Sequence, residues 1–279
     1  MSNIVKKLPY DSEIIKLLEI KVCEILGKES IYYKYPVIFK DFFNKIDDEK
    51  IDKLNDSSLL IYLYVCLSDD FFDRKEIKKD YINSFNLAHI FYDEGIKILN
   101  ILFKDDKTFW DIWNYRRSIF FSVNTFNNKI GFNLKEYILL AQNKSELGKL
   151  AIDSLFILSG LCNKNEYENL LSTHDLFSIG FQLLDDVEDF SVDLKENNTT
   201  NYILNEMIKD GIVINNYKEV QEEYLNLKYL IKTLNLSIFY FEKAENELIK
   251  SNSYFNRIII TKKKKAYLYL NEIQKINER

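Results

Sequence analysis

Apolar residues recur through most of this chain at the three- and four-residue spacing that puts them on one face of an α-helix. This pattern predicts ten helices, at residues 11–26, 58–78, 80–103, 109–128, 134–160, 165–193, 199–210, 216–233, 236–249 and 252–276. Residues that break helices are scarce, because the chain has only 7 glycines and 2 prolines and both prolines precede residue 37. The pattern therefore predicts an all-α protein, and no linker divides residues 1–279 into separate domains.

Two clusters of acidic residues interrupt the apolar helices. The first, DDFFD, occupies residues 69–73 at the end of an apolar run, and the second, DDVED, occupies residues 185–189 at the end of another. In a helix Asp69 and Asp73 share one face, and Asp185, Asp189 and Asp193 form a ladder with one carboxylate per turn. Like charges at this spacing repel one another, and the cost rises near a core. Each cluster alone is typical of a solvated helix face, but the two together favour a metal site.

Carboxylate oxygens select magnesium or calcium over zinc, and magnesium often binds through one or two carboxylates together with substrate phosphate oxygens. The sequence therefore predicts a magnesium-bound diphosphate. The metal ligands we expect are Asp69, Asp70, Asp73, Asp185, Asp186, Asp189 and Asp193.

The patterns DDxxD and FQxxDDxxD resemble the two acid motifs of the class I isoprenoid synthases, a superfamily of prenyl diphosphate synthases, squalene/phytoene synthases and class I terpene cyclases. The resemblance spans residues 59–200 and implies a single-domain antiparallel helical barrel or bundle of about ten to twelve helices, spanning residues 1–279. It also implies three Mg²⁺ ions around the diphosphate of a prenyl substrate. Asn143-Lys144-Ser145 resembles the family's Lys-Thr pair, and residues 193–200 resemble its DLxxGKxT segment with Asn-Asn in place of Gly-Lys.

Basic residues near these motifs are candidates for binding the diphosphate. The resemblance assigns this role to Lys144, and Arg74 directly adjoins the first motif. The basic run at residues 262–265 is either a solvated helix face or part of a C-terminal segment that closes over the site. In the second interpretation Lys264 and Tyr267 contact the diphosphate.

The departures from the family pattern indicate which branch of it the chain resembles. A chain-elongating enzyme needs a second diphosphate pocket rich in arginine, but the chain has no arginine before Arg74, and Arg74-Lys75 directly adjoins the first motif in place of the family's later Arg pair. We therefore expect a terpene synthase that ionises one linear C15 or C20 prenyl diphosphate. Alternatives are a trans-prenyl diphosphate synthase or squalene/phytoene synthase-like enzyme, and a catalytically silent homologue that binds a prenyl ligand or a partner.

A cation formed by ionisation must be shielded from water, and aromatic faces stabilise it without offering a nucleophile. Aromatic residues make up 15% of the chain. The candidates to line the substrate pocket lie on or near the motif helices, and any one of them taken alone fits core packing better than pocket lining. They are Tyr62, Tyr64, Cys66, Phe72, Trp113, Phe181 and Gln182.

Charge and cysteine content limit the partners. The net charge of −5 argues against nucleic acid as the main partner, because that affinity comes from neutralising phosphates. No apolar run reaches the length of a transmembrane helix. The three cysteines are odd in number and widely spaced, which favours the cytoplasm over secretion. Members of the family commonly form homodimers, and the sequence leaves the oligomeric state of this chain open.

Overall fold

The computed structural model describes residues 4–26, 31–43, 45–72, 79–123, 130–196, 198–213, 220 and 227–277. Side chains at residues 32, 69–72, 79–84, 276 and 277 lie outside this description. The described residues form twelve α-helices and three short 3₁₀ helices, with no strand among them. The prediction of an all-α fold with about ten to twelve helices is therefore confirmed.

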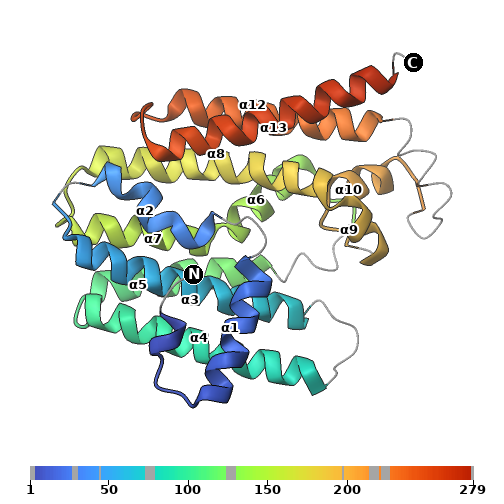
Figure 1. The fold of residues 1–279 in the computed structure, drawn as a ribbon. Helices are drawn as coiled ribbons and strands as arrows, with labels where there is room; N and C mark the ends of the chain where they lie inside the picture. Colours follow the sequence, from blue (N-terminus) through green and yellow to red (C-terminus); the bar gives the residue numbers. More distant parts are fainter. Residues whose placement is uncertain are drawn as a thin grey trace. The chain divides into compact units, whose positions relative to one another are not determined.

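The chain groups into two compact units, which are described separately (Figure 1). The first unit consists of Met1–Asp111 and Ala151–Cys162, and the second of Ile112–Leu150 and Asn163–Arg279. Two helices contribute residues to both units, α5 (Lys107–Ser122) and α7 (Glu146–Leu158). The prediction of a single domain stays a prediction.

The first unit is built around the helix pair α3 and α4. Its elements are η1 (Val5–Lys7), α1 (Ser12–Leu26), η2 (Tyr32–Lys34), α2 (Tyr35–Phe39), η3 (Lys40–Phe42), α3 (Asp48–Phe72) and α4 (Lys79–Phe103). Leucines along α3 pack with Phe91 of α4 and with Leu18 of α1 in one buried cluster. The Ser57 hydroxyl of α3 donates to the Gly95 carbonyl of α4 at 3.0 Å. A Cβ at Gly95 would meet Ile61 at 3.0 Å, so glycine permits this close approach.

The second unit is a layered arrangement of long helices (Figure 1). Its remaining elements are α6 (Leu134–Lys144), α8 (Lys164–Glu188), α9 (Phe190–Glu196), α10 (Tyr202–Lys209), α12 (Lys228–Glu247) and α13 (Tyr254–Asn277). Helix α8 packs against α12, and α12 packs against α13. At Gly180 an added Cβ would lie 3.1 Å from the Ser237 carbonyl oxygen, so α8 and α12 touch where α8 has no side chain. The Ser237 hydroxyl donates to the Gly180 carbonyl at 2.7 Å.

Several predicted helix boundaries are wrong. The helix expected at 58–78 begins ten residues earlier, at Asp48, because buried Ile51 and Leu54 continue its inner face through a polar stretch. The breaks expected near residues 233–236 are absent from α12, where Leu230, Leu234 and Ile238 keep the buried spacing. The short helices of residues 32–42 were not predicted.

Two helices that the sequence predicts as continuous are interrupted. The helix expected at 134–160 stops at Lys144 and resumes at Glu146, and the helix expected at 165–193 stops at Glu188 and resumes at Phe190. Neither interruption contains glycine or proline, so the sequence carries no strong signal for them. Both fall at residues of the predicted site.

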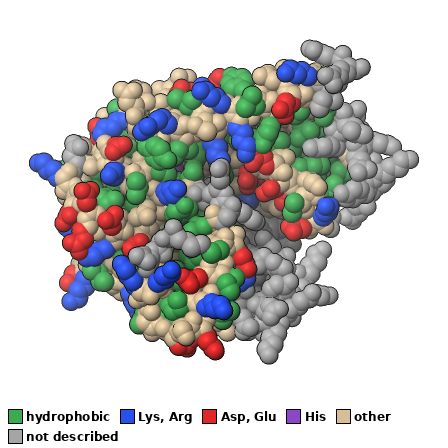
Figure 2. All heavy atoms as spheres, in the orientation of Figure 1, with side chains coloured by type: hydrophobic (Ala, Val, Ile, Leu, Met, Phe, Trp, Pro, Cys, Tyr) green, Lys and Arg blue, Asp and Glu red, His purple; other side chains and the backbone are tan. Residues whose placement is uncertain are grey.

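The surface mixes charges of both signs. On the face drawn in Figure 2, lysine and arginine side chains are interspersed with acidic ones. In the part of the chain that the structure describes, no helix combines the length and the apolar character needed to cross a membrane.

Candidate metal centre

The second acid motif lies where α8 passes into α9, in the second unit. Asp185 and Asp186 occupy the last turn of α8, and Asp189 is the residue at its C-terminal end. The Asp189 N–H donates to the Asp185 carbonyl at 2.8 Å, and the Asp193 N–H donates to the Asp189 carbonyl at 2.9 Å. Because these bonds keep the spacing of one turn through the interruption, the backbone retains the predicted ladder of Asp185, Asp189 and Asp193.

The Asp186 carboxylate is held by three protein donors. Its Oδ2 accepts from the Tyr137 hydroxyl at 2.7 Å and from the Tyr202 backbone N–H at 2.7 Å, and its Oδ1 accepts from Gln182 Nε2 at 3.0 Å. Burial raises the pKa of the Asp186 carboxyl to about 6, although the Lys144 charge and these hydrogen bonds oppose the shift. Asp186 therefore joins α6, α8 and α10, and its side chain has little capacity left for a metal ion.

Asp193 is held in a similar way by two asparagines. Its Oδ1 accepts from Asn198 Nδ2 at 2.8 Å, and its Oδ2 accepts from Asn201 Nδ2 at 2.7 Å. The same Asn201 amide donates to the Asp186 carbonyl at 2.8 Å, and Asn201 Oδ1 accepts from the Ile203 N–H at 2.9 Å at the start of α10. Asp193 thus fixes the residues that resemble the family's DLxxGKxT segment.

Asp185 differs from these two residues in the charges that surround its carboxylate. Burial, followed by the charges of Asp189 and Asp186, raises the pKa of the Asp185 carboxyl to about 7, and only Lys144 among the main contributors opposes this. Asp189 is exposed. Two carboxylates one turn apart, of which Asp185 lies among like charges, offer oxygen ligands that suit a divalent cation such as Mg²⁺.

The described side chains do not form a complete metal site by themselves. Among them, no three acidic, histidine or cysteine side chains converge closely enough to hold an ion. Of the first motif, Asp69 and Asp70 belong to the last turn of α3, but their side chains lie outside the described part of the structure, as do all atoms of Asp73. The prediction that the first motif supplies ligands stays a prediction.

Lys144 lies next to the acid ladder. It is the last residue of α6, and its positive charge lowers the pKa of both Asp185 and Asp186. The helix is interrupted directly after it, at Ser145, whose hydroxyl donates to the Gln142 carbonyl at 2.8 Å. This arrangement agrees with the place that the resemblance gives to the diphosphate-binding lysine.

The other candidates for binding a diphosphate are placed differently. Arg74 lies outside the described residues. On α13, Lys264 is exposed, and the Tyr267 hydroxyl donates to Glu242 Oε1 of α12 at 2.7 Å. The lysines of α13 that contact α8 are Lys262 and Lys265, which sequence reasoning did not select.

Lys262 and Lys265 approach the end of α8 that carries the motif. Lys262 Nζ lies 4.9 Å from the centre of the Phe181 ring, and Lys265 Nζ pairs with Glu188 Oε1 at 2.5 Å. The buried residues Ile259, Ala266 and Leu270 mark the inner face of α13. The spacing of these three residues in the sequence could have indicated that Lys262 and Lys265 lie closer to the inner face of α13 than Lys264 does.

The predicted pocket residues fall into both units. Tyr62, Tyr64 and Cys66 are half-buried on α3 in the first unit, where the Tyr64 ring lies 4.9 Å from Tyr92 and the Tyr62 ring 6.2 Å from Tyr33. The Phe72 side chain is outside the description. In the second unit Trp113 is buried on α5. Only Phe181 and Gln182 lie on the helix that carries the acid ladder, one turn before it.

A buried group of charges was missed by sequence reasoning. Glu146 accepts from Arg116 at 2.7 Å and from Lys149 at 2.5 Å, and Lys149 also pairs with Asp175 at 2.5 Å. Next to them, burial and then the charges of Lys149 and Arg116 lower the pKa of His174 well below its usual value. These residues join α5, α7 and α8 directly after the interruption at Ser145, and they were missed because they are far apart in sequence.

Comparisons with known proteins give no family for this chain. No protein-family model matches it, and a search of curated proteins finds no match. The functional argument therefore rests on the residues and their arrangement.

Proposed function

We propose that this protein is a magnesium-dependent terpene synthase of the class I isoprenoid type, which ionises a linear C15 or C20 prenyl diphosphate and rearranges or cyclises the resulting carbocation. The observation that carries the proposal is the pair Asp185 and Asp189, one turn apart at the end of a buried helix, with Lys144 as the neighbouring cation. Such a pair offers oxygen ligands to a divalent cation, and a phosphorylated substrate is the usual partner of magnesium held by so few carboxylates.

Each residue of the site has a role that follows from its contacts. Asp185 and Asp189 would hold magnesium, which supplies Lewis acidity that favours cleavage of the allylic C–O bond. Lys144 would donate to the diphosphate oxygens. Asp186, Asp193 and the donors around them are positioning residues, because their hydrogen bonds fix α6, α8 and α10 around the ladder.

Phe181 lies on α8, one turn before the ladder. Its ring lies 5.8 Å from the Phe177 ring and beneath Lys262, so it already contacts a cation. A ring in this position could stabilise positive charge on a substrate while presenting no nucleophile. For the substrate to reach this ring, Lys262 would either move aside or stay over the leaving diphosphate. The second alternative corresponds to the C-terminal segment that, by the resemblance, closes over the site.

The direct test is to incubate the protein and magnesium with geranyl, farnesyl and geranylgeranyl diphosphates, each with and without isopentenyl diphosphate, and to identify the products by gas chromatography and mass spectrometry. We expect a hydrocarbon or alcohol from one allylic substrate alone, and none from Asp185→Asn. A matched control is Glu242→Gln, which removes a half-buried acid on α12 that contacts the exposed Tyr267. Longer diphosphates formed only with isopentenyl diphosphate would indicate a condensing enzyme instead. No turnover with any mixture would favour the silent homologue.

A further inference from the structure

The second unit contains an open depression of about 560 Å³ that is not formed by the carboxylates of the acid ladder. Helices α10 and α12 line it, together with the first residue of α6. The lining residues are Leu134, Tyr202, Glu206, Lys209, Lys232 and Leu236, together with Asn235. Its volume lies within the range of roughly 300–1,000 Å³ that small-molecule sites occupy.

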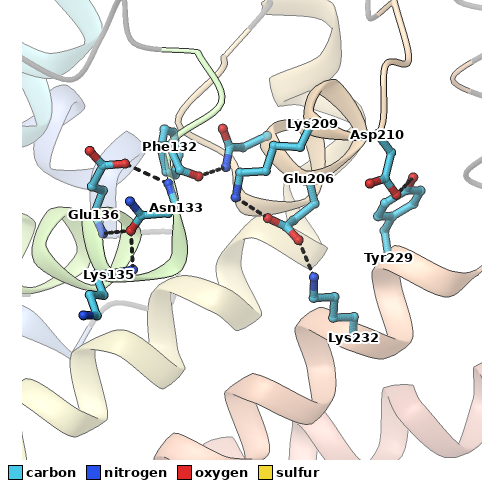
Figure 3. A network of polar contacts seen from close by, with 10 residues as sticks. Phe132, Asn133, Lys135, Glu136, Glu206, Lys209, Asp210, Tyr229 and Lys232 are labelled. Atoms are coloured by element: carbon cyan, nitrogen blue, oxygen red, sulfur yellow. Dashed lines mark hydrogen bonds and ion pairs between the residues drawn. The ribbon is translucent and has the colours of Figure 1, made fainter.

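The polar side of the depression carries an excess of positive charge. Glu206 lies between Lys209 and Lys232 and accepts from both, from Lys209 at 2.6 Å (Figure 3). Burial alone would raise the pKa of the Glu206 carboxyl, but these two lysines lower it below its usual value. The Lys232 charge also helps to lower the pKa of Asp210, but the Asp210 carboxylate pairs with Lys228. Two ammonium groups with three N–H donors each therefore share one carboxylate, which leaves donors for an anion.

The opposite side of the depression is apolar and fixed in place. Leu134 and Leu236 pack on a buried cluster that includes Tyr202. The start of α6 is held by Asn133, which accepts from the Glu136 N–H while Glu136 accepts from the Asn133 N–H (Figure 3). The Asn205 amide of α10 donates to the Phe132 carbonyl at 2.7 Å. Because these contacts already order the walls, a ligand would not have to order them on binding.

We infer that this depression binds a small organic anion, with its apolar body against Leu134 and Leu236 and its charged group on Lys209 and Lys232. The site differs from the proposed diphosphate site, because neither Lys144 nor any acid of the ladder lines the depression; Tyr202, which does, is linked to Asp186 through its backbone N–H. The inference does not depend on the proposed function. Its alternative is that Glu206, Lys209 and Lys232 form only an ion cluster that joins α10 to α12.

The test is a calorimetric titration with phenyl phosphate in the presence of a metal chelator, so that no metal-dependent diphosphate site takes part. For the wild-type protein we expect a dissociation constant of about 0.1–1 mM. Lys232→Gln should weaken binding about tenfold, because it removes one charged donor. Lys228→Gln is the matched control, since Lys228 lies one turn earlier on α12, is exposed, and pairs with Asp210 outside the depression; it should leave binding unchanged.

Three further ligands separate the contributions of charge and apolar contact. Benzoate replaces the phosphate by a carboxylate, and binding of either anion that is sensitive to Lys232→Gln supports the site. Phenol and inorganic phosphate, which each lack one half of the ligand, should bind at least about tenfold more weakly than phenyl phosphate. No binding of phenyl phosphate or benzoate up to about 10 mM would overturn the inference. Equal affinity in the wild type and Lys232→Gln would also overturn it, as would inorganic phosphate binding as tightly as phenyl phosphate.

Discussion

Asp185 and Asp186 are neighbours in the sequence, yet their carboxylates have opposite surroundings. Asp186 accepts three hydrogen bonds from protein donors, whereas the surroundings of Asp185 add burial and three like charges, opposed by Lys144. A motif written as DD conceals this difference, because it depends on Tyr137 and Tyr202, which are far away in sequence. The geometry favours Asp185 as the metal ligand of the pair and Asp186 as the residue that positions it.

The raised pKa of Asp185 predicts how its replacement changes stability. Since the folded-state pKa is about 7 and the ordinary value is 3.8, the folded state binds more protons between these values. Its stability therefore falls as the pH rises through this window. In metal-free protein Asp185→Asn should raise the free energy of unfolding at pH 8 by roughly 1–3 kcal/mol, and by less at pH 5.

Chemical denaturation with a chelator present, at pH 8 and at pH 5, measures this effect. Glu242→Gln is again the control, and it should change stability little at either pH because its hydrogen bond to the Tyr267 hydroxyl is exposed to solvent. A loss of stability in Asp185→Asn at pH 8 would show that the carboxylate is already well compensated within the protein, and that it does not await a cation.

Tyr137 should matter through Asp186. Its hydroxyl is a donor to a fully buried carboxylate, so Tyr137→Phe leaves that carboxylate with one partner fewer and no water to replace it. We expect a loss of about 1–3 kcal/mol in the free energy of unfolding at pH 8. Tyr254→Phe, on an exposed tyrosine of α13, should cost almost nothing in the same thermal or chemical denaturation. Equal stability of the two variants would contradict the role given to Tyr137.

At the scale of the helices, the site is assembled at interruptions. Helix α6 ends at Lys144 and α8 ends at Glu188, so the cation and the acid ladder both lie at helix ends within the second unit. The interruption at Ser145 is followed by the charges of Glu146 and Lys149, which pair with Arg116 and Asp175 on neighbouring helices. These pairs fix where α7 begins and, through it, where Lys144 lies.

The contact between α8 and α12 depends on Gly180. A methyl group there would lie 3.1 Å from both the Ser237 carbonyl oxygen and the Phe241 ring, and the backbone atom cannot move aside as a flexible side chain could. Gly180→Ala should therefore destabilise the protein by about 1–3 kcal/mol, although alanine favours helix formation. Ser172→Ala, on an exposed position of the same helix, is the control. A more stable Gly180→Ala protein would mean that the two helices are not packed so closely.

Much of the helix pattern could be predicted from the sequence, and the reasons for the failures are physical. Helix α4 was expected at 80–103 and runs from Lys79 to Phe103, because its apolar positions are strictly periodic. The interruptions at Ser145 and Asp189 could not be predicted, because buried side chains and tertiary hydrogen bonds create them. Residues 32–42 were missed since their helices are only three to five residues long.

The sequence predicted part of the arrangement of side chains around α8. The ladder of Asp185, Asp189 and Asp193 follows from spacing alone, and Lys144 was found through the resemblance. The distinction between Lys264 and its neighbours Lys262 and Lys265 required knowing which face of α13 is buried. The roles of Asn201 and Tyr137 could not be predicted, because a hydrogen bond between residues that are apart in the chain leaves no pattern in the sequence.

For the molecule as a whole, the central claim is that the acid ladder and Lys144 form a joint site for magnesium and a diphosphate. Binding to such a site is reciprocal, since each ligand supplies charge that the other needs. The alternative is a helical protein that binds a metal ion such as calcium only for stability. Such a protein has no diphosphate site, so its melting temperature would respond to the metal alone.

The most direct measurement is therefore a thermal-shift titration with magnesium and pyrophosphate, separately and together, on the wild type, Asp185→Asn and Glu242→Gln. We predict that the wild type and Glu242→Gln show a shift with both ligands that exceeds the sum of the separate shifts, and that each ligand tightens the other by about tenfold or more. Asp185→Asn should lose this mutual dependence. Strictly additive shifts in the wild type, or a dependence that survives in Asp185→Asn, would contradict the account.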